Sequence, residues 1–229
     1  MFGGRIVQEA NLRREKPDYN KVGKWLDKEL KKRQVWAILM PRTGNVTDSP
    51  FLQGIERHPD WQLVFLSRRQ KLIVDIKTAQ GKKLFEGIFN KTTVYPNDYY
   101  RNIMLAHNLL RYGQKVESKK QGLMLAIQAF ELRPSVLAMR KILFANRIDQ
   151  LRPTVIGYCQ KYLEKFMVDK DVWVKEDGYR GKIVPAIIAC NYLSSLAEIS
   201  KDQKLAKFYL DKRKEYEKEF KAIIATKRW

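Results

Sequence analysis

The spacing of apolar residues after residue 95 constrains the fold more than any other feature of the chain. Apolar side chains recur there at intervals of three and four, which places them along one face of each successive helix. The expected helices span residues 98–112, 119–132, 135–147, 153–168, 180–199 and 202–225. Short breaks separate them, at Gly113, Arg133-Pro134, Arg152-Pro153, Asp177-Gly178 and Ser200-Lys201. Because short connections leave neighbouring helices antiparallel, this region predicts an array of helical hairpins.

The residues before 95 contain shorter elements, among them three apolar runs that predict strands. These runs cover residues 35–40, 61–66 and 71–76. In the third run Leu72, Val74 and Ile76 alternate, which predicts one apolar face. The polar segment over residues 67–70 is short enough to join the second and third strands as a hairpin.

Two helices are expected around these strands. Asp18 is a good capping residue, and the helix that follows it ends in basic residues at 31–33. A shorter helix is expected over residues 49–57. Gln80-Gly81 is expected to close this part of the chain, with residues 84–89 as a short amphipathic link. The predicted order of elements is therefore αβαββ.

Small and apolar residues mark the first expected helical hairpin. They are Ala106, Leu109, Leu110 and Gly113 on its first helix, then Gly122, Ala126, Ala129, Phe130 and Leu132 on its second, followed by Pro134. Over residues 99–134 this pattern resembles about one unit of the tetratricopeptide repeat. The resemblance implies a repeat array that presents a concave face to a protein partner. A generic antiparallel helix pair is the alternative, because the residues from 153 onward keep the hairpin shape without the repeat signature.

A turn at His58-Pro59-Asp60-Trp61 follows the short helix and begins the second strand. With the apolar runs on either side of it, residues 18–77 resemble, more weakly, the extramembrane C-terminal region of bacterial GT-C-type multi-pass membrane proteins. In such proteins the catalytic acid lies in loops among the membrane helices. The resemblance therefore implies an extramembrane part without catalytic residues of its own.

Together these features predict an α+β fold: a small three-stranded sheet with helices, followed by an all-α array of tetratricopeptide-like helical hairpins. The predicted domains are residues 1–94 and 95–229, with the boundary at Tyr95-Pro96. No run of about 18 apolar residues is present, and the charged start has no signal-peptide core, so no membrane span is expected.

The chain is strongly basic, with 45 Lys and Arg against 25 Asp and Glu and a net charge of +20. The excess is spread over both parts, because residues 1–95 hold 19 basic and 10 acidic residues and residues 96–229 hold 26 and 15. Such a surface favours an acidic protein, an anionic membrane surface or nucleic acid as partner. Solubility alone would also explain it.

Candidate contact residues are basic side chains expected at exposed positions. They are Arg68, Arg69 and Lys71 at the hairpin tip, Lys82 and Lys83 close behind in sequence, and Lys119 and Lys120 in the loop between the repeat helices. Arginines on a rigid hairpin can form forked hydrogen bonds with phosphate or carboxylate groups. The alternative is an ordinary solvated turn.

No constellation of catalytic or metal-binding residues appears. His58 and His107 are the only histidines, and neither belongs to a hydrolase, zinc or phosphate-loop motif. Cys159 and Cys190 each lie in an apolar helical stretch, which favours buried free thiols, although one bridge between them stays open. We therefore expect no metal, no cofactor and no small-molecule ligand, and a non-enzymatic role for this chain alone.

The predicted function is that of a basic interaction or scaffold domain that binds an acidic or anionic partner, most simply a protein. Two alternatives remain: the extramembrane domain of a glycosyltransferase-like polytopic membrane protein whose catalytic part is absent here, and a component of a ribonucleoprotein. The location of the protein stays open.

Overall fold

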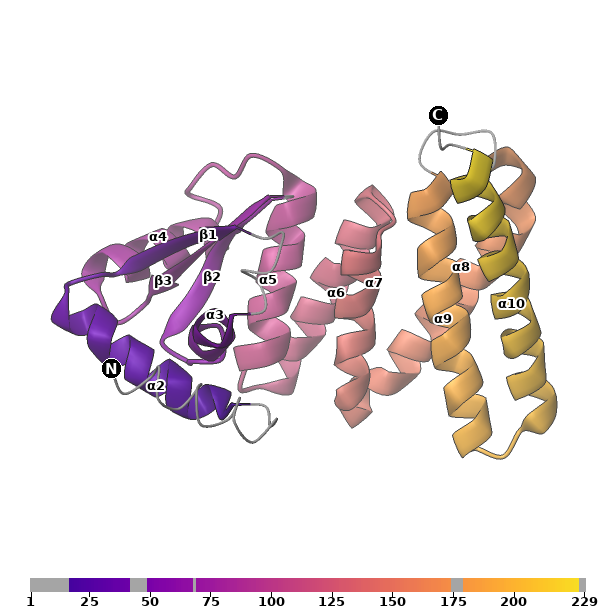
Figure 1. Cartoon of the computed structure of the whole chain (residues 1–229), viewed down its shortest axis with the longest axis horizontal. Coiled ribbons are helices and arrows are strands. Elements are labelled where there is room, and N and C mark those ends of the chain that lie inside the picture. Colours follow the sequence, from indigo (N-terminus) through magenta and orange to yellow (C-terminus); the bar gives the residue numbers. More distant parts are fainter. Residues whose placement is uncertain (1–16, 42–48, 68, 174–178, 227–229) are drawn as a thin grey trace. The chain divides into compact units, whose positions relative to one another are not determined.

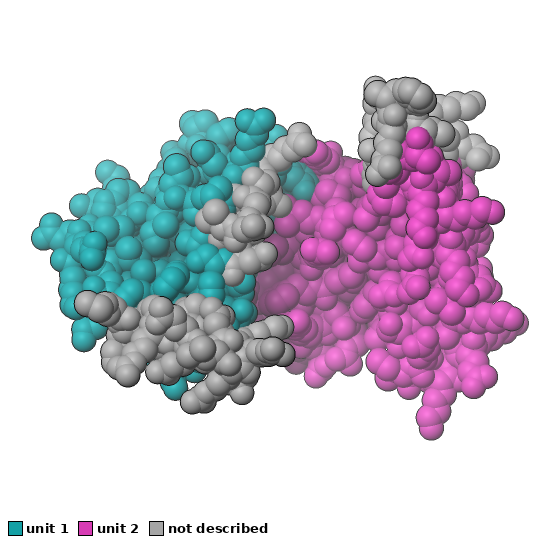
Figure 2. Space-filling model, in the orientation of Figure 1, with its two compact units in different colours: residues 1–108 teal, residues 109–229 magenta. Residues whose placement is uncertain are grey.

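The structure, a computed structural model, describes residues 17–41, 49–67, 69–173 and 179–226. The predicted α+β class is confirmed: a small antiparallel sheet with helices precedes an array of helices (Figure 1). Two units, residues 1–108 and 109–229, are distinguished by their internal contacts (Figure 2). The division falls inside helix α5 (Asp98–Tyr112), whereas the sequence placed the domain boundary just before this helix.

The sheet of the first unit contains strands β1 (Ala37–Pro41), β2 (Trp61–Leu66) and β3 (Gln70–Asp75). Its order is β1-β3-β2, so the last strand in sequence lies in the centre and pairs antiparallel with both others. Ile73 is opposite Ile38 on one side and Leu63 on the other. The β2–β3 turn is closed by Ser67, whose hydroxyl accepts from the backbone amides of Arg69 and Gln70.

Helices α2 (Tyr19–Lys32) and α3 (Pro50–Ile55) pack on one face of this sheet. The Asp18 carboxylate caps α2 as predicted, by accepting from the amides of the second and third residues after it. The core beneath these helices is formed by fully buried or nearly buried residues: Met40, Ile55, Trp61 and Ile73. The two helices approach at backbone distance, because a Cβ built on Gly23 would lie 2.4 Å from the carbonyl oxygen of Gly54.

The sequence predicts one apolar face on β3, whereas the structure buries residues on both faces of this strand. Ile73 is 2% exposed and Val74 is fully buried, and adjacent residues of a strand point to opposite faces. Both faces are buried because β3 is the central strand and a further helix, α4, packs against β2 and β3.

Helix α4 (Ala79–Phe89) corrects the expected closure at Gln80-Gly81 followed by a short link. The Thr78 hydroxyl caps this helix by accepting from the amide of Gly81 at 3.1 Å. Gly81 is buried, and a Cβ on it would lie 2.1 Å from the carbonyl oxygen of Asp75. The glycine therefore allows the first helical turn to pass close to the end of β3, and it does not break the chain into a turn.

The second unit is helical, as the sequence predicts. After the end of α5 its helices are α6 (Val116–Leu132), α7 (Val136–Phe144), α8 (Arg152–Trp173), α9 (Tyr179–Ile199) and α10 (Gln203–Thr226). Two short 3₁₀ turns, Ala145–Arg147 and Asp149–Leu151, connect α7 to α8. α6 packs on α7, α8 on α9, and α9 along α10.

The small residue Gly122 lies where two helices approach closely. A Cβ on this residue would lie 3.0 Å from the Leu109 Cβ, so α6 passes tightly against the end of α5. The likeness of this hairpin to the tetratricopeptide repeat stays a resemblance. Cys159 and Cys190 are both buried and free, as predicted.

Helix α9 contains a stretch, Gly181–Ile199, whose length and composition would allow it to cross a membrane, contrary to the expectation from the sequence. Almost half of that stretch is buried within the structure, and α9 contacts α7, α8 and α10. Buried core helices pass the same test of length and composition, so we interpret α9 as the central helix of the array.

Candidate functional site

The basic residues of the predicted hairpin tip do not form one exposed cluster. Arg68 lies outside the described residues. Arg69 is exposed at the β2–β3 turn. Lys71 is mostly buried, with 15% of its side chain exposed, and forms an ion pair with Glu56 at the end of α3. The prediction that Lys71 projects from the tip is therefore wrong, because its position in β3 directs it toward α3.

Lys82 and Lys83 lie in the first two turns of α4, both exposed. Helix α4 follows the end of β3 that is opposite the hairpin tip, and the strand rises roughly 3.3 Å per residue over its six residues. These two lysines therefore lie at the other end of β3 from Arg69, although they are close to it in sequence. They border a shallow hollow together with Asn90 and Thr92, and Lys82 is 3.9 Å from Glu86.

Lys119 and Lys120 belong to the first turns of α6 and not to the preceding loop, and the helix begins three residues earlier than predicted. Glu117 in the first turn helps to explain the earlier start, because a carboxylate there interacts favourably with the helix dipole. Lys120 is exposed and Lys119 partly buried. The structure keeps these two lysines together, as it does Lys82 and Lys83.

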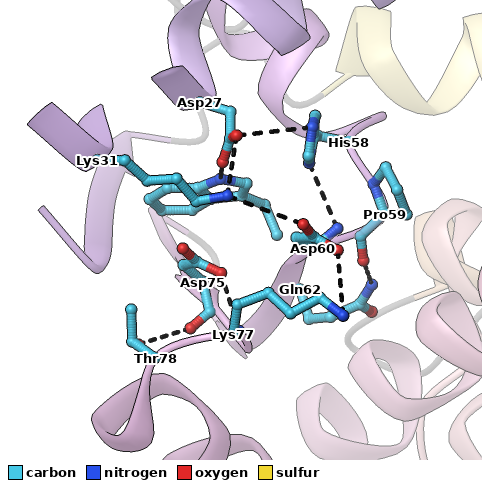
Figure 3. Close-up of polar contacts among 10 residues, drawn as sticks. Asp27, Lys31, His58, Pro59, Asp60, Gln62, Asp75, Lys77 and Thr78 are labelled. Carbon is cyan, nitrogen blue, oxygen red and sulfur yellow. Dashed lines mark hydrogen bonds and ion pairs between the residues drawn. The ribbon is translucent and has the colours of Figure 1, made fainter. Parts of the chain in front are cut away.

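A network of polar contacts surrounds the His58-Pro59-Asp60-Trp61 turn (Figure 3). The Asp27 carboxylate on α2 accepts from the Trp61 indole N–H at 2.8 Å and from the Lys31 ammonium at 2.9 Å. The Lys31 ammonium also lies 3.8 Å from Asp60. The network thus ties the middle of α2 to the beginning of β2.

The charge state of Asp27 follows from these contacts. Burial raises the pKa of its carboxyl group, but the hydrogen bonds from Trp61 and Lys31 more than offset burial and hold the pKa below 3.8. Burial lowers the Lys31 pKa, but the hydrogen bond to Asp27 and the charges of Asp27, Asp75 and Asp60 together raise it above its ordinary value. Asp27 is therefore a carboxylate at neutral pH.

His58 uses both ring nitrogens within the network. Nδ1 accepts from the Asp60 amide at 3.4 Å, and Nε2 is 3.9 Å from the nearer Asp27 oxygen. The side chain is only 13% exposed. A general base needs a free nitrogen directed at a substrate proton. The geometry of His58 instead suits a residue that fixes the turn.

Asp75, at the end of β3, is the one acidic residue of this region that is fully buried. Its Oδ1 accepts from the amide of Lys77 at 2.9 Å, and its Oδ2 has no hydrogen-bond partner among the described residues. The backbone of Asp75 is held as well, since its carbonyl accepts from the Thr78 hydroxyl at 2.7 Å. The carboxylate thus organises the turn between β3 and α4.

The second unit contains an aromatic hollow that sequence reasoning did not find. It has a volume of about 330 Å³ and lies between α6 and α8. Its walls are mainly aromatic: Phe130 from α6, and Tyr158, Tyr162 and Trp173 from α8. Pro134, just after α6, completes the apolar lining. We refer to this site as the aromatic hollow.

Edge-to-face contacts fix the rings of the aromatic hollow. Phe130 meets Tyr162 at a centroid distance of 4.8 Å and an angle of 90°, and Tyr158 at 6.0 Å and 85°. The Tyr162 hydroxyl donates to the Lys182 carbonyl at 2.6 Å. Burial raises the pKa of both tyrosines, and for Tyr158 the nearby Glu131 raises it further.

Charged groups border the aromatic hollow on both helices. Lys161 and Lys165 from α8 are exposed, and among the described lining residues Glu131 from α6 is the one carboxylate. The Lys182 ammonium lies 4.4 Å from the ring centroid of Trp173. The described part of the rim is therefore predominantly positive.

Among the residues that the structure describes, no three His, Cys, Asp or Glu side chains lie together as a metal site would require. No protein-family model, curated protein or solved structure matches the chain.

Proposed function

We propose that the chain is a non-enzymatic interaction domain that binds an acidic protein partner. The observation that carries the proposal is that two lysines at the aromatic hollow are exposed and not paired with a described carboxylate. Lys161 and Lys165 are exposed and form no ion pair with a carboxylate of the described residues. Lys170, farther along the same helix, is bound to Glu215 at 3.1 Å and to Glu219 at 2.9 Å.

The contrast within α8 supports an external anionic partner. Where α8 faces α10, carboxylates of the chain neutralise its lysine. Where α8 borders the hollow, the lysines are left to solvent beside an apolar surface. Opposite charge on a partner would gain Coulomb energy there, and its apolar groups would be removed from water.

A protein suits this surface better than a nucleic acid does. Some exposed cations of the chain are paired with carboxylates, as for Lys82 and Glu86 on α4. Nucleic-acid backbones need an array of unopposed cations and yield little apolar burial. An acidic polypeptide can pair with separate lysines and also fill an apolar hollow.

The test is a binding titration of the full chain with fluorescent poly-glutamate, at about 50 mM and about 200 mM salt. We expect binding at the lower salt concentration and clear weakening at the higher one, because the contacts are exposed ion pairs. Lys161→Glu/Lys165→Glu should reduce affinity at low salt at least tenfold. Lys204→Glu/Lys207→Glu changes the same charge at exposed positions of α10 and serves as the control.

Single-stranded nucleic acid and vesicles containing anionic lipid are measured in parallel. Tighter binding of either one than of poly-glutamate would contradict the proposal, as would the absence of poly-glutamate binding at low salt. Equal losses in the two double variants would show that only net charge matters and would remove the α8 lysines from the proposal.

A further inference from the structure

We infer that the aromatic hollow is an anchor site for one large apolar side chain of an acidic peptide segment. This inference rests on the proposed function and specifies its partner. The segment would place a phenylalanine, tryptophan or leucine side chain between α6 and α8. Its flanking Asp and Glu residues would pair with Lys161 and Lys165.

The size of the hollow limits what can enter it. A volume of about 330 Å³ is at the lower end of the range of ligand-binding pockets. A large side chain with part of its backbone fits such a volume, whereas a whole helix or strand does not. Interfaces commonly gain most of their binding energy from a few such residues in desolvated pockets.

The walls are formed in advance. Phe130 is 2% exposed and Tyr162 is 8% exposed, and each is held by the edge-to-face contact between them. The hydrogen bond from Tyr162 to the Lys182 carbonyl fixes the second ring from α9. Ligand binding would therefore cost little ordering of these side chains, which favours affinity.

The charges around the hollow select the sign of the ligand. Lys161 and Lys165 are four residues apart and so lie on the same side of α8. Aromatic walls can also hold cations, but the Lys182 ammonium already lies over the ring of Trp173. Among the described residues, a positively charged ligand would meet the ammonium groups of Lys161, Lys165 and Lys182 against one carboxylate, that of Glu131. An acidic ligand would be attracted by these ammonium groups and repelled, among the described groups, only by the Glu131 carboxylate.

The face of α6 that carries Glu131 extends the site along the helix. Met124 and Lys120 are seven and eleven residues before Glu131, which places all three on one face. Met124 is 47% exposed, and Lys120 is exposed and forms no ion pair with a described residue. A flexible thioether followed by an ammonium group repeats the apolar-and-basic character of the hollow. The surface thus suits an extended segment that continues past its anchor residue.

The experiment compares two fluorescent peptides with the full chain by anisotropy. Both consist of Asp and Glu residues, and they differ only at the central position, which is Phe in one and Ala in the other. Because the charge is identical, a difference in affinity reports burial of the ring. We expect the Phe peptide to bind at least about tenfold more tightly.

Two variants locate the effect. Glu131→Gln removes the carboxylate of the lining and should tighten binding of the Phe peptide about two- to fivefold, a gain that misfolding cannot produce. Tyr158→Ala should remove the preference for Phe over Ala while leaving the weaker binding of the Ala peptide in place. Met167→Ala alters a partly exposed apolar residue elsewhere on α8 and is the control.

Equal affinity of the two peptides would overturn the anchor inference and leave the proposed function intact, since both peptides are acidic. A preference for Phe that persists in Tyr158→Ala, with Glu131→Gln unchanged, would place the anchor site elsewhere and also overturn it. Failure of poly-glutamate to bind would instead reject the proposed function itself.

Discussion

The indole N–H of Trp61 donates to Oδ1 of Asp27 at 2.8 Å, across 34 residues of sequence. Trp61 is 1% exposed, so its N–H has no access to bulk water and needs this acceptor. Asp27 is in turn held ionised by the same bond and by Lys31. The hydrogen bond of Trp61, the largest side chain in the core of the first unit, therefore depends on the charge of Asp27.

Asp27→Asn should destabilise the first unit by about 1–3 kcal/mol at neutral pH, because the bond from Trp61 to a charged acceptor is weakened. The pKa of Asp27 is lower in the folded protein than its ordinary value of 3.8. Its contribution to the free energy of unfolding is therefore present above pH 3.8 and lost as the pH falls through the folded value. Urea unfolding followed by tryptophan fluorescence between about pH 3 and pH 7 measures both effects.

Glu29→Gln is the matched control for this series, since it removes one carboxylate from the same helix. Glu29 is bound to Lys32 at an exposed position, so the change should alter stability much less. A stability difference between wild type and Asp27→Asn that stays constant from neutral pH down to pH 3 would show that the ionised Asp27 is not what supports Trp61.

Gly23→Ala should destabilise the contact between α2 and α3. The added methyl group would lie 2.4 Å from the Gly54 carbonyl oxygen, which is backbone and cannot rotate away. Overpacking of this kind costs about 1–3 kcal/mol. Hydrogen exchange should show faster exchange of the amides of α2 and α3, while that of α8 to α10 stays unchanged.

Gly157→Ala makes the same chemical change in the interior of α8 with the opposite expectation. Apart from the helix's own backbone and the two adjacent residues, no atom lies within 4 Å of a Cβ at this position. Alanine should therefore stabilise the helix by about 0.5–1 kcal/mol, through the lower entropy of the unfolded chain. If thermal unfolding shows both alanine variants to be destabilised equally, the steric account of Gly23 fails.

Tyr95→Phe should cost about 1–2 kcal/mol, because the Tyr95 hydroxyl donates to the Leu66 carbonyl at 3.2 Å and accepts from the Leu66 amide at 2.7 Å. Burial raises the pKa of Tyr95 to about 12. The fold thus favours the neutral phenol, and this contribution is complete below pH 10 and lost as the pH rises toward 12. Unfolding measured from about pH 8 to pH 11 should show a fall that Tyr95→Phe reduces and Tyr100→Phe does not.

Cys159 and Cys190 should be unreactive in the folded protein. Burial raises the pKa of each thiol to about 12, and each is at most 1% exposed. The nucleophilic thiolate is therefore scarce at about pH 8. A disulfide reagent such as DTNB should label both cysteines in denaturant and neither in native protein within minutes; rapid native labelling would contradict the burial.

The helices were the most predictable part of the molecule. Helix α5 has the predicted bounds, because Asp98 opens it and Gly113 follows its end. Helix α4 was missed since Gly81 has the sequence character of a break, whereas its role is a close backbone approach to Asp75. Only the three-dimensional neighbourhood of a glycine separates these two cases.

The candidate site was less predictable than the fold, for a related reason. The residues around Lys71 are typical of an exposed turn with basic side chains, so the sequence gives no sign that Lys71 is mostly buried. Its ion pair with Glu56 depends on how β3 lies against α3. Phe130 and Tyr158 form the aromatic hollow from separate helices. A signal existed in the four-residue spacing of Tyr158 and Tyr162, but such spacing is equally typical of an ordinary helical core.

The central position of β3 has a consequence for synthesis. β1 and β2 pair only with β3 and not with each other, and β3 is the last of the three to leave the ribosome. The first strand must therefore wait, unpaired, through the translation of α3 and β2. A nascent chain that ends at Leu66 therefore lacks the strand with which both others pair, and the complete hydrogen-bond ladder can form only after β3 has emerged.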